Sequence, residues 1–170
     1  MDQPQTPPPR TRGVLLVVGA IVVVLCVVFG VTVLRQKSQY EDYVAATLEA
    51  GPMPWEQGPL SVEECVAFTV SWGMECPGVE SWCMGQAPRL TGECLAARDR
   101  EQICAALGDA VASTHFGYGE CEQMRETVEG RYAKRGHKKY CAASYRAVAE
   151  HCRELGGGPK PSAMPVAPAG

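Results

Sequence analysis

The apolar residues of the chain follow two patterns, and the first is an unbroken run over residues 13–34. This run contains no charged residue and no proline. As an α-helix, which rises 1.5 Å per residue, it would be about 33 Å long, and the hydrocarbon core of a bilayer is roughly 30 Å thick. The run is longer than the hydrophobic part of a signal peptide, and no small-residue cleavage site follows it. We therefore predict that residues 13–34 are an uncleaved transmembrane signal anchor.

Beyond residue 60 the apolar positions recur at the three- to four-residue spacing of an α-helix. Ser61 and Glu64 have the capping-box pattern that marks the start of a helix. The apolar stripe behind them consists of Cys65, Phe68, Trp72 and Cys76. A strand is the alternative, because every second residue is also large and apolar at Val66, Phe68, Val70 and Trp72. The capping box favours the helix.

Similar patterns predict three further helices. One starts near Thr91 and runs through Val111, after an interruption at residues 85–88. The other two cover residues 119–130 and 138–155. The predicted fold is mainly α: a single N-terminal transmembrane helix and a small disulfide-stapled bundle of about four short helices.

Composition divides the chain into segments around the anchor. Both ends are rich in proline and lack a hydrophobic pattern, which is typical of disorder. In order, we predict a disordered cytoplasmic tail (1–12), the anchor (13–34), a juxtamembrane helix (35–50), a Pro/Gly hinge (51–59), a cysteine-rich helical domain (60–155) and a disordered tail (156–170).

Cysteine usage sets the predicted orientation. Cys26 lies in the anchor, and the other eight cysteines lie in the predicted domain. An even number of cysteines in a small domain indicates disulfides, which persist in oxidising compartments. Lysine and arginine flank the anchor almost equally, so charge alone does not orient it. We predict a single-pass membrane protein with a cytoplasmic N-terminus and an extracytoplasmic domain. The short tail and the Ala/Gly/Pro-rich composition favour a bacterial inner membrane facing the periplasm, and the alternative compartment is an endoplasmic reticulum lumen.

The cysteine spacing predicts nested disulfides. Cys65 and Cys76 are eleven residues apart, as are the last two cysteines, and eleven residues make almost three helical turns. Two antiparallel helices with such cysteines can be joined at both ends. With one hairpin turn near residue 85 and another near residue 136, the predicted pairs are Cys65–Cys104, Cys76–Cys94, Cys83–Cys141 and Cys121–Cys152.

Charge is unevenly distributed along the domain. Residues 38–124 contain fourteen acidic and three basic residues, whereas residues 125–170 contain nine basic and four acidic ones. The basic residues concentrate at Arg131, Lys134, Arg135, Lys138 and Lys139. A solvated loop explains this stretch, and the alternative is a patch that binds the acidic half of the domain, an acidic partner, or anionic head groups and polymers at the membrane surface. We treat it as a candidate anion- or partner-binding patch.

The three tryptophans are candidates for a partner site or for covers over the disulfides. Trp72 belongs to the predicted first helix of the domain, whereas Trp55 and Trp82 lie in segments rich in proline and glycine. Exposed tryptophan is common in protein interfaces. Small disulfide-rich domains also use tryptophan to shield their bridges, and we favour that role.

Motifs of enzymes and metal proteins are absent from the sequence. No C-x-x-C, H-E-x-x-H or G-x-S-x-G segment occurs. We therefore predict no catalytic residue, no cofactor and no bound metal, and we expect no nucleic-acid partner in this compartment. A small hydrolase would need a cleft that brings His115 or His137 against a serine or a carboxylate.

These features together predict a membrane-tethered, disulfide-rich, non-enzymatic interaction or structural module of the cell envelope. Its expected partner is another envelope protein or an anionic surface polymer. The alternative is an envelope thiol-redox or metal-handling protein that uses some of the eight domain cysteines.

Overall fold

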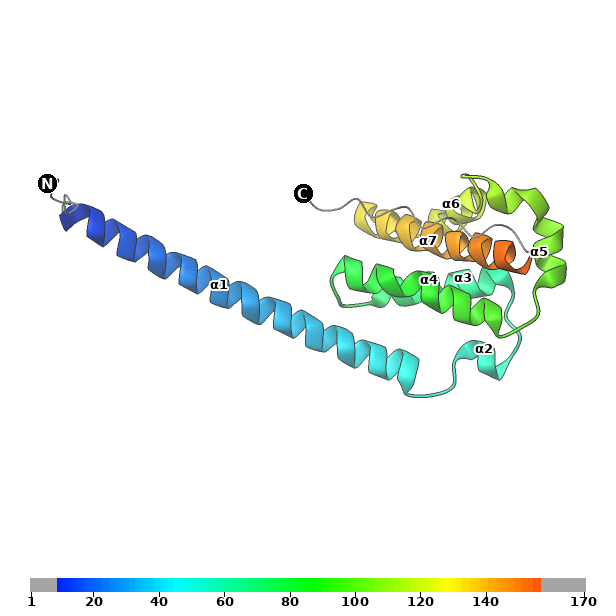
Figure 1. Ribbon diagram of the computed structural model, residues 1–170, viewed down its shortest axis with the longest axis horizontal. Coiled ribbons are helices and arrows are strands. Elements are labelled where there is room, and N and C mark those ends of the chain that lie inside the picture. Colours follow the sequence, from blue (N-terminus) through cyan, green and yellow to red (C-terminus); the bar gives the residue numbers. More distant parts are fainter. Residues whose placement is uncertain (1–8, 157–170) are drawn as a thin grey trace, which may run out of the picture.

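Every regular element in the described part of the chain is helical. The computed structural model describes residues 9–156 (Figure 1). Its α-helices are α1 (Pro9–Val44), α2 (Pro54–Gln57), α3 (Val62–Glu75), α4 (Glu80–Ala96), α5 (Glu101–Leu107), α6 (Tyr118–Glu126) and α7 (Arg131–Leu155). A π-helical turn, Ala45–Glu49, extends α1, and a 3-10 turn, Gly108–Ala112, follows α5. The predicted mainly α fold is confirmed.

α1 carries the whole apolar run as one continuous helix. It is long and apolar enough to cross a membrane, and nearly all side chains between residues 13 and 34 are exposed in the isolated chain. Of the predicted N-terminal tail, residues 9–12 belong to α1, and residues 1–8 lie outside the described residues. Apart from Gly156, the predicted C-terminal tail also lies outside them.

Aromatic side chains dock the C-terminal part of α1 on the helical domain. The ring centroid of Tyr40 lies 5.6 Å from that of Trp82. Tyr43 lies beside Trp72, with 5.4 Å between their ring centroids, and its hydroxyl donates to the Trp72 carbonyl at 3.1 Å. The Trp72 indole N–H in turn donates to Oγ1 of Thr47 at 2.8 Å. The helix expected over residues 35–50 is therefore an extension of α1, and its contacts fix the position of the domain relative to α1.

Residues 51–59, predicted as a hinge, pack against the domain. Proline starts the short helix α2, where its missing N–H costs nothing. Trp55 of α2 is buried, and its ring meets the ring of Phe68 edge-on at 5.3 Å. The burial of Trp55 therefore fixes the path of the chain between α1 and α3.

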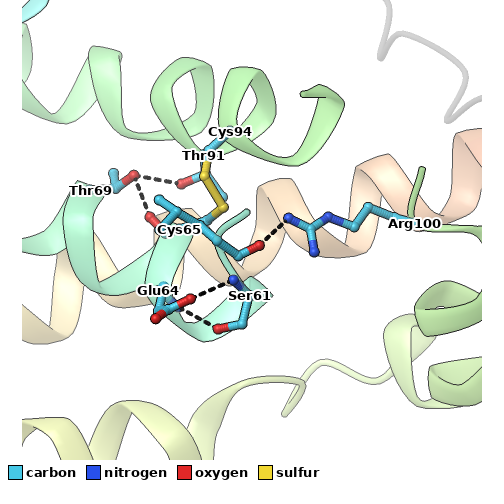
Figure 2. The surroundings of a disulfide bond; sticks show 8 residues. Ser61, Glu64, Cys65, Thr69, Thr91, Cys94 and Arg100 are labelled. Carbon is cyan, nitrogen blue, oxygen red and sulfur yellow. Dashed lines mark hydrogen bonds between the residues drawn. A yellow bond between two sulfur atoms is a disulfide. The ribbon is translucent and has the colours of Figure 1, made fainter. Parts of the chain in front are cut away.

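α3, α4 and α7 lie side by side and enclose the core (Figure 1). Val66 of α3, Leu90 of α4 and Val148 of α7 are fully buried between them. A buried polar contact joins α3 to α4, because the hydroxyls of Thr91 and Thr69 are hydrogen-bonded at 3.1 Å (Figure 2). The smaller helices α5 and α6 pack on α7. The long helix α7 is therefore the element on which the rest of the domain is assembled.

The predicted start of α3 is confirmed. The Ser61 hydroxyl accepts the backbone N–H of Glu64 at 3.1 Å, and the Glu64 carboxylate accepts the N–H of Ser61 at 2.6 Å (Figure 2). Arg100, which is buried, donates to the carbonyl of Leu60 at 2.6 Å. The cap and this contact together fix the point where the chain enters α3, and the segment is a helix rather than a strand.

The helix boundaries after α3 differ from the prediction. The chain turns at residues 76–79, since a residue before proline avoids the helical conformation and Cys76 accordingly has ψ 120°. Gly85 and Pro88, expected to interrupt a helix, lie inside α4. Pro88 is on the exposed side, where water can satisfy a backbone carbonyl that has lost its partner. The helix expected to start near Thr91 is instead divided between the end of α4 and α5.

All eight domain cysteines form disulfides, but none of the predicted pairs is correct. The observed disulfides are Cys65–Cys94, Cys76–Cys83, Cys104–Cys152 and Cys121–Cys141, with Cα–Cα distances of 5.0 to 6.0 Å. The predicted pairs Cys65–Cys104, Cys76–Cys94, Cys83–Cys141 and Cys121–Cys152 are wrong. Within the described residues, Cys26 in α1 is the free cysteine.

The predicted pairings are wrong because two turns of the chain lie at other positions than expected. Cys65–Cys94 and Cys76–Cys83 are nested across a hairpin, as expected, but the turn lies at residues 76–79 instead of near residue 85. The turn between α6 and α7 lies at residues 127–130 instead of near residue 136. This earlier turn brings Cys121 opposite Cys141.

Candidate anion-binding surface

Four of the five residues in the predicted basic patch form one stripe on α7. They are Arg131, Lys134, Arg135 and Lys138. Their spacing of i, i+3, i+4 and i+7 puts them on one face of a helix, and α7 begins with the first of them. Together with Arg125 of α6 they line an open hollow of about 670 Å³. We call these four residues and Arg125 the basic surface.

Lys139, the fifth predicted residue, does not belong to the basic surface. It forms an ion pair with Glu80 at the start of α4. The hydrogen bond from Lys139, followed by its charge and the charge of Arg135, lowers the pKa of Glu80. Lys139 therefore links α7 to α4, and the predicted patch is corrected by one residue.

Acidic side chains leave most of the basic surface unneutralised. Among residues 9–156, Arg125 pairs with Glu122, whereas the four basic residues of the α7 stripe form no ion pair. Of the five predicted residues, only Lys139 forms an ion pair with the acidic first part of the domain, although the charges of Glu80 and Arg135 also act on each other. A row of four cations thus faces the hollow without an ion-pair partner among the described residues.

The backbone at the start of α7 adds to this positive character. The N-cap residue is Gly130, which has φ 85° and no side chain to accept the free N–H groups of the first turn. No acidic residue lies in that turn, although the helix dipole favours acids there. α3, by contrast, begins with a capping box and two glutamates. The start of α7 therefore lacks the usual stabilising groups and presents N–H donors beside the cations.

Exposed aromatic rings border the basic surface. Lys138 Nζ lies 5.4 Å from the ring centroid of Tyr118, a cation–π contact, and Tyr118 is 54% exposed. Tyr132, in the first turn of α7, is 89% exposed. Amphipathic aromatic rings beside lysine and arginine are typical of surfaces that meet lipid head groups or a protein partner.

The histidines do not form a catalytic arrangement. His137 is buried near Arg125, and burial, followed by the charge of Arg125, lowers its pKa. His137 is therefore neutral at pH 7 and adds no charge to the basic surface. His115 is exposed and lies edge-on to Tyr118 at 6.5 Å. Among the described residues, neither imidazole is hydrogen-bonded to a serine or a carboxylate.

Two of the tryptophans are buried, and the third supports α1. Trp72 lies in the core, as predicted, and Trp55 is buried against α3. Trp82 is half-buried against Tyr40. The tryptophans therefore connect α1 and α2 to the domain, and none of them borders the basic surface.

The cations and free backbone N–H groups of the basic surface suit an anionic group. Arginine can hold phosphate, sulfate or carboxylate through two N–H groups, and lysine provides a mobile point charge. The hollow is open, so it fits a group presented on a larger partner. Within residues 9–156, no group of three or more His, Cys, Asp or Glu could hold a metal ion.

Comparison with known proteins gave no relative of this chain: no family model, curated protein or solved structure matches it.

Proposed function

We propose that the protein is a membrane-anchored, disulfide-stabilised, non-enzymatic interaction module of the cell envelope, and that the basic surface is its binding site for an anionic partner. The observation that carries this proposal is the stripe of four cations, which lines a hollow at an uncapped helix start and forms no ion pair among the described residues. Such a stripe attracts anionic groups through charge and backbone dipoles alike.

The membrane anchor is α1. Its apolar length and exposed side chains support a single crossing, and the disulfide content of the domain supports an oxidising side. On this proposal the N-terminus is cytoplasmic and the domain projects into a bacterial periplasm. The partner is then an envelope component that carries phosphate, sulfate or carboxylate groups.

The closed disulfides favour this function over thiol-redox or metal-handling activity. All eight domain cysteines lie at bonding distance in pairs, so the native domain presents no thiolate as a nucleophile or ligand. Three of these pairs join different helices, and the fourth closes the turn between α3 and α4. Their positions are those of structural cross-links.

Polyanion binding by the full chain tests the proposal. The protein is placed in nanodiscs of phosphatidylcholine, which is net neutral, and its retention on immobilised heparin is measured against salt. We expect salt-dependent retention that is lost when the stripe is replaced (R131S/K134S/R135S/K138S). Replacement of Arg146 and Arg153, which are exposed on α7 outside the hollow, is the matched control and should retain binding. Equal elution of the wild type and the stripe variant would overturn the proposal.

A further inference from the structure

We propose that the basic surface rests on anionic lipid head groups of the same bilayer that holds α1. This inference rests on the proposed function, because it names the partner of the same surface. It follows from the direction in which α1 and α7 run and from the contacts that fix one relative to the other (Figure 1).

The aromatic contacts of α1 set the distance of the α3–α4 turn from the membrane. Tyr40 lies six residues beyond Leu34, the last residue of the apolar run, which is about 9 Å farther along the helix. Tyr40 packs on Trp82, and Gly78 is so close that an added Cβ would lie 2.8 Å from the Tyr40 ring. The turn between α3 and α4 is therefore held just beyond the membrane end of α1.

α7 carries the basic surface from this level back towards the membrane. Lys139 is paired with Glu80, which lies directly after the α3–α4 turn. Arg131 precedes Lys139 by eight residues, or about 12 Å of helix. Figure 1 shows that the N-terminal end of α7 points to the same end of the domain as the membrane-spanning part of α1. Arg131 therefore lies near the level at which the apolar run ends, where the head groups of a bilayer begin.

The side chains at this level suit a bilayer surface. The lysines and arginines of the stripe are long enough to reach phosphate groups, and Tyr118 and Tyr132 expose amphipathic rings beside them. Arg35 follows the apolar run of α1 directly and adds positive charge at the same level, and Lys37, two residues further on, is paired with Glu41 at 3.5 Å. Two separate parts of the chain thus present cations to the head groups, and a basic cluster next to a membrane helix is attracted to anionic lipid.

Docking fixes the orientation of the whole domain. α1 holds one side through Tyr40 and Tyr43, and the basic surface holds α7 against the bilayer. The end of α7 that carries Cys152 then points away from the membrane. A domain fixed at two points presents one defined face to the periplasm.

Lysine footprinting in nanodiscs tests this inference. Full-length protein is placed in discs of phosphatidylcholine alone and in discs that contain equal parts of phosphatidylglycerol, and a water-soluble amine-reactive reagent labels the lysines. We expect the labelling rates of Lys134 and Lys138 to fall about tenfold in the anionic discs and to recover at high salt. The variant R131S/R135S should lose most of this protection, and the control R146S/R153S should keep it.

Two further arms separate the possible outcomes. Protein in phosphatidylcholine discs is mixed with separate phosphatidylglycerol vesicles in one arm and with soluble heparin in the other. Protection by heparin or by separate vesicles, without protection in the anionic discs, would overturn the inference and leave the proposed function standing. Absence of protection in every arm would overturn both.

Discussion

The indole N–H of Trp72 donates to Oγ1 of Thr47 at 2.8 Å, and this bond ties the turn that extends α1 to the disulfide-linked hairpin of α3 and α4. Thr47 lies in the π-helical turn that ends α1, and Trp72 is 4% exposed in α3. The two residues are 25 positions apart in the chain. The bond connects the extension of α1 to the domain, so we expect a change at this contact to alter the stability of both.

Replacement of Trp72 by phenylalanine should loosen the end of α1. The substitution removes the hydrogen bond to Thr47 and part of the contact with Tyr43. We expect a loss of about 1 to 2 kcal/mol in the free energy of unfolding. Hydrogen exchange of residues 45–49 should become faster. T47V removes the same bond from the other side and should give a similar change in exchange. Unchanged exchange in both variants would show that the contact does not hold α1.

Gly117 is a position where only glycine fits. Its φ is 76°, and an added Cβ would lie 2.1 Å from Cγ of Tyr145 in the core. We expect G117A to lower the free energy of unfolding by about 3 kcal/mol, from backbone strain together with overpacking. Gly85 is the matched control, because it lies inside α4 with no atom within 4 Å of an added Cβ. G85A should raise stability by about 1 kcal/mol. Chemical unfolding of the two variants measures both effects, and equal stabilities would contradict this assignment.

The disulfides should differ in their contribution to stability. Cys104–Cys152 spans 48 residues, and Cys76–Cys83 spans 7. Since a longer closed loop removes more entropy from the unfolded chain, loss of the first should cost about 2 kcal/mol more than loss of the second. Unfolding of C104A/C152A and C76A/C83A under non-reducing conditions measures this difference. A larger loss in C76A/C83A would contradict the pairing.

One substitution at the start of α7 should raise the stability of the domain and weaken its binding. A glutamate in place of Arg131 suits the helix dipole, so R131E should raise the free energy of unfolding by about 0.5 kcal/mol. The same change should weaken retention on heparin. Arg153 lies in the last turn of α7, where a cation is favourable, so R153E should lower stability and leave heparin retention unchanged. If R131E destabilises the domain, the positive charge at Arg131 is structural instead of functional.

Acid should weaken the fold through His137, which is buried, and His151, which is half-buried. Burial is the main cause that lowers the pKa of both His137 and His151 in the folded state. Since their pKa values are higher in the unfolded chain, the unfolded state binds more protons as the pH falls below about 6.5, and folding stability falls with it. The contribution of the two histidines to folding stability is fully present above this pH. It is lost as the pH falls from their pKa in the unfolded chain to their pKa in the folded chain.

Replacement of both histidines tests this pH dependence. In the variant H137L/H151L, the free energy of unfolding should change less between pH about 7.5 and about 5 than in the wild type. His115 is exposed, so H115L serves as the control and should keep the dependence of the wild type. An equally steep loss in H137L/H151L would assign the acid effect to other groups.

Local signals in the sequence predicted the fold class but misplaced the turns. The capping box at Ser61 was readable because its two hydrogen bonds form between residues three apart. The sequence does not reveal the start of α4, because Gly85 and Pro88 predict a break in the helix, although both occupy exposed positions where a helix tolerates them. The disulfides then followed the misplaced turns, because pairing depends on which cysteines face one another in space.

The sequence predicts only part of the basic surface, because the arrangement of its residues depends on where helix α7 begins. Its residues were identified by composition, but their i, i+3, i+4, i+7 spacing has meaning only once α7 is known to begin at Arg131. Glycine is unfavourable inside a helix, and Gly136 lies within α7. In the fold it lies where Met74 packs on α7, and an added Cβ would stand 3.2 Å from the Met74 sulfur. The separation of Lys139 from the other four residues depends on Glu80, which lies 59 residues away and is brought near by tertiary packing.

The proposed function depends above all on the eight domain cysteines being closed into disulfides in the cell. The direct measurement is a free-thiol titration of the full-length protein, taken from native membranes and denatured without reduction. We expect one free thiol, that of Cys26. Three or more free thiols would contradict the proposed function, and would favour a redox or metal-handling protein in its place.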